Sequence, residues 1–118
     1  MEAKVLNVIE EDRKECIYEL YSGRNASFDI TISNNELTFH GEEFGADCES
    51  IFGRSDGDFY YKMSKEDTYK FLTQLRLEQG IELSLEEILR IKFGSDEGSL
   101  CFLDYCKKRG IVLDTFVI

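Results

Sequence analysis

Residues 28–40 read Phe-Asp-Ile-Thr-Ile-Ser-Asn-Asn-Glu-Leu-Thr-Phe-His, and this stretch holds the clearest hairpin pattern of the chain. Apolar and polar residues alternate on both sides of Asn34-Asn35, with the period of two that is typical of strands with one buried face. Asparagine tolerates the positive φ that a tight hairpin turn requires. The stretch therefore predicts a hairpin of two half-buried strands, with Phe28, Ile30, Ile32, Leu37 and Phe39 as its apolar positions.

Short apolar runs flank this hairpin in the N-terminal half of the chain. Six consecutive polar residues separate residues 5–9 from residues 16–21, so these two runs predict two strands, with a single N-terminal helix as the alternative. Residues 59–63 predict a further strand. Residues 41–57 contain four glycines and five acids, and they predict an irregular connection.

After Ser64 the period changes to that of helices. Ser64 and its following acids predict a helix start, and Gly80 a helix end. Ser84 and Glu87 form the pattern of a capping box, and a third helix is expected over residues 97–109. The residues predicted to face inward are Thr68, Phe71, Leu72, Leu75, Leu85, Ile88, Leu89, Leu100, Leu103 and Tyr105 or Cys106.

The order of these elements is strands, then helices, then an apolar strand over residues 111–118. This order predicts an α+β fold rather than alternating α/β. We expect a mostly antiparallel sheet, built from the N-terminal half and the C-terminal strand and covered on one face by about three helices. Residues 1–118 have the size of a single domain.

The sequence carries neither a pattern of a signal peptide nor an apolar run long enough to span a membrane. Cys16, Cys48, Cys101 and Cys106 are scattered. We therefore expect free, mostly buried thiols in reducing cytoplasm, with two disulfides in an oxidising compartment as the alternative.

The negative charge is concentrated in the first half of the chain. The formal net charge is −10, and residues 1–60 hold five Lys or Arg against fourteen Asp or Glu. Within residues 25–61 the only Lys or Arg is Arg54. Such a field repels phosphate backbones, so we expect no direct nucleic-acid binding, and it would steer a basic protein towards this chain. The alternative is that the acidity only keeps the protein soluble.

Motifs of catalysis and of metal binding are missing from the sequence. His40 is the only histidine, and its place at the end of the hairpin predicts an exposed surface side chain. Cys101 and Cys106 would point about 140° apart on a helix and cannot hold one zinc ion. Neither a phosphate-binding glycine loop nor a nucleophile elbow occurs. We expect a protein that is not an enzyme and has no cofactor or metal.

Two stretches carry a resemblance to a known class of proteins. They are Asp58-Phe-Tyr-Tyr-Lys-Met-Ser-Lys-Glu-Asp67, which runs into the leucine-spaced residues 68–75, and the ending 101–118 with its closing Gly-Ile strand. This C-terminal half resembles small immunity proteins of bacterial polymorphic toxin systems, in particular those of contact-dependent growth inhibition. The resemblance implies a cytoplasmic bacterial protein that binds a cognate toxin domain, often a nuclease, and blocks its active site or its access to substrate.

A basic nuclease groove would be met by the acidic tract of this chain. The predicted partner-binding residues are Glu42, Glu43, Asp47, Glu49, Asp56 and Asp58, with Phe44 and Tyr60 as aromatic anchors or, alternatively, as core residues. Three other functions stay open. They are a phage-type inhibitor that mimics nucleic acid and acts on a host nuclease, a small hydrolase with a carboxylate-bound metal, and a regulatory module that self-associates through a strand edge.

Overall fold

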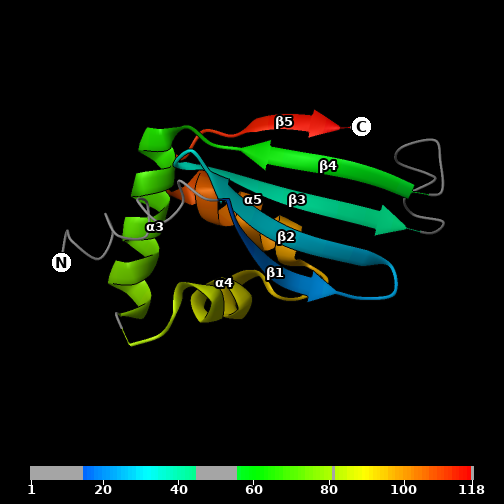
Figure 1. Cartoon of the computed structure of the whole chain (residues 1–118), viewed down its shortest axis with the longest axis horizontal. Helices are drawn as coiled ribbons and strands as arrows, with labels where there is room; N and C mark the ends of the chain where they lie inside the picture. The colour runs from blue at the N-terminus through cyan, green and yellow to red at the C-terminus, as the bar shows by residue number, and fades with distance from the viewer. Residues whose placement is uncertain (1–14, 45–55, 81, 118) are drawn as a thin grey trace.

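The computed structural model describes residues 15–44, 56–80 and 82–117. These residues form an α+β fold with one open antiparallel sheet, in the strand order β1-β2-β3-β4-β5, and three helices (Figure 1). The strands are β1 (Cys16–Ser22), β2 (Ala26–Ser33), β3 (Glu36–Phe44), β4 (Asp56–Lys62) and β5 (Asp114–Val117). The helices are α3 (Lys65–Gln79), α4 (Leu85–Phe93) and α5 (Gly98–Lys108). The predicted fold class is confirmed.

The hairpin of β2 and β3 has the predicted turn and the predicted buried positions. Asn34 and Asn35 have φ values of 54° and 64°, which is the left-handed region that a two-residue hairpin turn needs. Ser33 therefore pairs with Glu36, and the register continues along the whole of both strands. The apolar positions of the hairpin are at most 1% exposed: Phe28, Ile30, Ile32, Leu37 and Phe39.

The prediction of an irregular connection over residues 41–57 is wrong at both of its ends. Residues 41–44 continue β3 and residues 56–57 begin β4, and the two stretches pair with each other. Gly41 is there for packing, because a Cβ atom at this position would lie 2.1 Å from the Phe59 ring. In a sequence, a glycine that makes room for a ring within a strand cannot be told from a glycine in a turn. The predicted end of the strand was therefore placed too early.

The three helices begin and end close to the predicted residues. Ser64 and Ser84 cap α3 and α4, and Ser84 forms the full capping box with Glu87. Gly80, with φ 82°, ends α3 in a conformation that favours glycine. Leu100 is a correction, because it is 63% exposed instead of inward.

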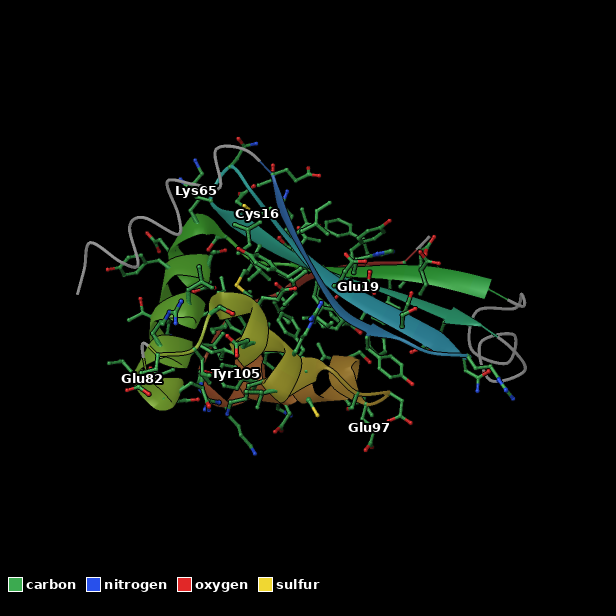
Figure 2. The ribbon with its side chains drawn as sticks, turned by 60° about the horizontal axis from the view of Figure 1, so that its bottom comes forward. Cys16, Glu19, Lys65, Glu82, Glu97 and Tyr105 are labelled. Carbon is green, nitrogen blue, oxygen red and sulfur yellow. The ribbon has the colours of Figure 1, made fainter. Side chains whose placement is uncertain are left out.

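Phe102 and Tyr105 set the rotation of α5 in place of Leu100. The Phe102 ring stacks on Phe39 of the sheet at 4.5 Å between centroids, and Tyr105 packs edge-on against Phe71 and Phe93. This aromatic core lies between the sheet and the helices. Figure 2 shows α4 and α5 together on one side of the sheet, with Tyr105 among them. We call the sheet surface turned away from these helices the open face.

The C-terminal segment returns to the sheet as predicted, but its strand begins only at Asp114 instead of Ile111. β5 pairs antiparallel with β4, and all four of its residues are exposed. The strand predicted over residues 5–9 lies outside the described residues. The expectation of mostly buried thiols is wrong for the described cysteines, because only Cys106 is buried, Cys16 is half-buried and Cys101 is exposed. No helix in the described ranges is long and apolar enough to cross a membrane.

A buried side chain ties α3 to the start of β3. The Leu37 amide donates a hydrogen bond of 3.0 Å to Thr68 Oγ1, and Thr68 is fully buried. Thr68→Val keeps the shape but leaves the Leu37 N–H without its acceptor, so it should lower the free energy of unfolding by about 1–3 kcal/mol.

Thr73→Val is the matched control on the same helix. The Thr73 hydroxyl is buried and has no hydrogen-bond partner among the described residues, so its replacement by a methyl group should not lower the free energy of unfolding. Urea denaturation of both variants measures the difference. Equal losses in the two variants would contradict the role given to the Thr68 hydroxyl.

Candidate functional site

The alternation of the strands places a polar and aromatic set of side chains on the open face. Across β2, β3 and β4, Asp29 lies opposite His40, and His40 lies opposite Tyr60. Two residues after His40 on β3, and on the same face, Glu42 lies opposite Asp58. Side chains directly opposite each other on neighbouring strands have Cβ atoms about 4.5–5.5 Å apart. The sheet therefore gathers carboxylates around the single imidazole of the chain.

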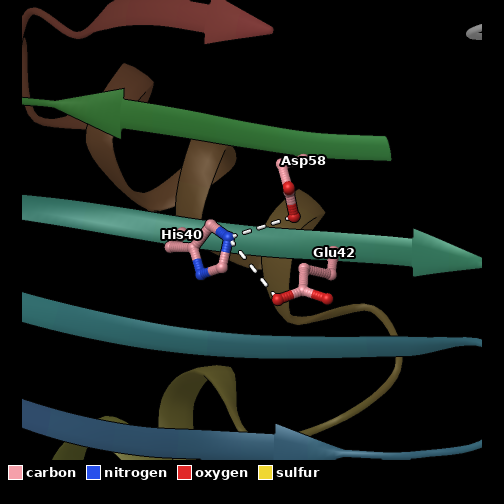
Figure 3. A group of neighbouring side chains, drawn as sticks. All are labelled: His40, Glu42 and Asp58. Atoms are coloured by element: carbon pink, nitrogen blue, oxygen red, sulfur yellow. Dashed lines mark hydrogen bonds and ion pairs between the residues drawn. The ribbon is translucent and has the colours of Figure 1, made fainter. Parts of the chain in front are cut away.

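We call His40, Asp29, Glu42 and Asp58 the His40 cluster. His40 Nδ1 lies 3.0 Å from Asp29 Oδ2, and His40 Nε2 lies 3.3 Å from Asp58 Oδ1. Glu42 Oε1 is 3.9 Å from the same Nε2 atom (Figure 3). Both ring nitrogens thus face carboxylates that come from three adjacent strands.

His40 is half-buried at the middle of β3, which corrects the prediction of an exposed histidine at a strand end. Its side chain is 19% exposed, against 30% for Asp29 and 41% for both Glu42 and Asp58. His40 is not at a strand end because β3 continues to Phe44, and the residues of β3 after His40 also pair with β4. The imidazole is the least exposed group of its cluster.

Aromatic rings extend the site towards the β5 edge. The Tyr60 ring stacks on His40 with 4.7 Å between centroids and 20° between planes. Phe116 lies opposite Tyr60 on β5 and is 52% exposed. A row of three rings therefore crosses β3, β4 and β5 next to the carboxylates. Exposed aromatic surface beside charge is typical of protein-binding sites.

The carboxylates change the protonation of His40. Burial alone would lower the pKa of His40, but the hydrogen bonds and charges of Asp29 and Asp58 outweigh burial and raise the pKa above its ordinary value of 6.5. The cluster thus favours positive charge at its centre. The groups that it attracts are a guanidinium, an ammonium, a proton or a metal cation.

Some other acids of the described residues have Lys or Arg partners. Glu78 pairs with Arg109 and Lys92 on the helix side of the sheet, and Glu36 pairs with Lys62 on the open face. Asp29, Glu42 and Asp58 form no ion pair with any Lys or Arg of the described residues, and their charges are shared by one imidazole. The His40 cluster therefore carries uncompensated negative charge.

The structure brings only part of the predicted site together. Glu42, Asp58 and Tyr60 meet on the open face. Glu43 points to the other face, where its charge adds to the effect of burial in raising the pKa of Tyr61. Phe44 and Asp56 pair through their backbones, and their side chains lie outside the described part of the chain, as do Asp47 and Glu49 altogether.

Three residues of the site were not among those predicted: Asp29, His40 and Phe116. The sequence held the signal for the first two, because a two-residue turn at Asn34-Asn35 sets Asp29 opposite His40. Phe116 could not be placed in this way. Its position depends on the pairing of β5 with β4, and the chain between these two strands is long.

No family model, no curated protein and no solved structure matches this chain. The chemistry of the site is therefore the basis for its function.

The raised pKa of His40 predicts a pH dependence of stability. Because the folded state binds the proton more tightly than the unfolded state, the contribution of His40 is complete below pH 6.5 and is lost as pH rises through the raised pKa. His40→Gln should remove this slope. Urea unfolding of both proteins from pH 6 to pH 9, in the presence of a chelator, measures it. A wild-type advantage that grows with pH would contradict the assignment.

Proposed function

We propose that this chain is an inhibitory binding protein of the immunity class, which neutralises a basic toxin domain by covering it with the open face of its sheet. The toxin domain is a nuclease in this proposal, and the site acts by binding rather than by catalysis. The partner is a protein rather than nucleic acid, since the His40 cluster would repel phosphates.

One observation carries the proposal: Asp29, Glu42 and Asp58 surround a single imidazole and have no Lys or Arg partner in the described residues. Charges that are partly buried and not compensated within the chain are costly unless a partner supplies the opposite charge. The pairing of Glu36 with Lys62 on the same face shows the arrangement that the cluster lacks.

The row of rings formed by His40, Tyr60 and Phe116 gives the open face a second property of an interface. Tyr60 and Phe116 offer apolar area next to the carboxylates. Binding energy at interfaces concentrates in a few well-packed aromatic or arginine side chains, while the charges around them set the encounter rate and the choice of partner. A toxin surface that combines arginines with an apolar patch would match both parts.

A nuclease domain supplies such a surface for a chemical reason. It must hold phosphates, and it does so with arginine and lysine side chains in its substrate groove. Carboxylates can accept the same hydrogen bonds as phosphate oxygens, and they form bidentate pairs with guanidinium. An acidic sheet face placed in the groove would therefore exclude the substrate.

The same physics would serve an inhibitor that mimics nucleic acid and acts on a host nuclease. The two functions differ in the origin of the target and not in the binding surface. Identification of the captured protein as a toxin domain or as a host enzyme separates them.

The proposal predicts selective capture by the open face. Wild-type protein used as bait in a lysate of the source organism should retain a basic nuclease-like domain, and Glu42→Lys/Asp58→Lys bait should not retain it. Asp96→Lys/Asp104→Lys is the matched control, because it changes the net charge equally at exposed positions outside the sheet. Equal capture by both variants, or no capture by wild-type bait, would contradict the proposal.

Association kinetics with the purified partner provide a quantitative check. Charge reversal at Glu42 and Asp58 should slow association about tenfold or more at low ionic strength and flatten its dependence on salt. The control variant should keep most of the wild-type rate and its salt dependence. A rate that does not change in the Glu42→Lys/Asp58→Lys variant would place the interface elsewhere.

A further inference from the structure

We propose that His40, Glu42 and Asp58 form a binding site for a divalent transition-metal ion, with Zn²⁺ as the ion to test. One ligand atom from each residue lies within 4.8 Å of the other two, and Figure 3 shows all three side chains converging over β3 and β4. The inference goes beyond the proposed function and does not depend on it.

The distances from His40 Nε2 to the two carboxylates are close to those of a metal site. Zinc bonds of about 2.0–2.2 Å to nitrogen and oxygen place neighbouring donor atoms about 3.0–3.5 Å apart. His40 Nε2 and Asp58 Oδ1 are already 3.3 Å apart. Glu42 Oε1 lies 3.9 Å from Nε2, and a rotation of this half-exposed side chain would close the difference of about half an ångström.

The backbone holds the three ligands in a fixed arrangement. His40 and Glu42 are two residues apart on β3, so they point to the same face, and Asp58 lies directly opposite Glu42 on β4. All three positions belong to inner strands of the sheet, with β2 on one side and β5 on the other. Ligands on paired strands keep their spacing better than ligands on loops.

A fourth residue outside the ligand set orients the histidine. Asp29 Oδ2 lies 3.0 Å from His40 Nδ1, on the far side of the ring from Glu42 and Asp58. Metal-binding histidines usually donate their second ring N–H to a carboxylate in this way, which leaves the other nitrogen free for the metal. The stacked Tyr60 ring holds the plane of the imidazole.

Charge and ligand type decide which metal fits. Two ionised carboxylates and a neutral imidazole carry the charge that a divalent cation compensates, and neither Glu42 nor Asp58 is paired with a Lys or Arg in the described residues. Mg²⁺ and Ca²⁺ prefer oxygen ligands, whereas an imidazole favours zinc and its neighbours. Three protein ligands would leave a coordination position towards solvent.

The single histidine makes the site directly observable. In the full chain without a histidine tag, freed of metal by a chelator at pH 7.5, every imidazole signal in the NMR spectrum comes from His40. Addition of ZnCl₂ should move these signals and saturate at one ion per chain, with the same stoichiometry by calorimetry. Zinc bound through thiols with an unmoved His40 signal, or no saturable binding, would overturn the site.

Variants identify the ligands. His40→Gln and Asp58→Asn should each weaken zinc binding at least tenfold, and Asp29→Ala, as a change to a positioning residue, by about 10–100-fold. Glu36→Gln on the same face and Cys101→Ser should stay within about twofold of wild type. Wild-type affinity in His40→Gln, or equal losses in the control variants, would reject these ligands. If a variant fails to fold, the His40 signals of the wild-type chain decide the question.

Discussion

The register of the β2–β3 hairpin determines both the buried side of the sheet and the residues of its candidate site. The positive φ values of Asn34 and Asn35 fix a two-residue turn, and this turn decides which residues of the two strands lie opposite each other. A slip by one residue would send every apolar side chain of one strand to the open face. The stabilisation from burying several phenylalanines and isoleucines would then be lost. The same register that buries Phe28 and Phe39 places Asp29 beside His40. Core and candidate site are thus two consequences of one pairing.

Two groups of acids in the fold differ in how their charge is balanced, and this difference supports the proposed function. On the helix side, Glu78 is held by Arg109 and Lys92, so that charge there serves the contact between α3, α4 and the end of α5. On the open face, the carboxylates of the His40 cluster share one half-buried imidazole. A cation from outside, whether a side chain of a partner protein or a metal ion, would lower the electrostatic cost of keeping them together. Tyr60 supplies a packed wall to the same site.

Much of the fold could be predicted because its signals are local. Period-two alternation, two serine caps and a turn of two asparagines each act over a few residues, and each is confirmed. The failures have non-local causes. Gly41 is required by the Phe59 ring from another strand, and α5 is rotated by the contact of Phe102 with Phe39, which leaves Leu100 exposed. The candidate site was predicted in part, because acids near each other in sequence point to opposite faces of a strand, as Glu42 and Glu43 do.

Carboxylate footprinting of the complex tests directly whether the open face is the binding surface. Carbodiimide coupling of an amine to exposed acids, read by peptide mass spectrometry, would be compared between the free chain and the chain bound to its captured partner. Glu42 and Asp58 should be labelled in the free chain and protected in the complex, while Asp96 and Asp104 should be labelled equally in both. Protection of the helix-side acids, with Glu42 and Asp58 still labelled in the complex, would show that the open face is not the binding surface.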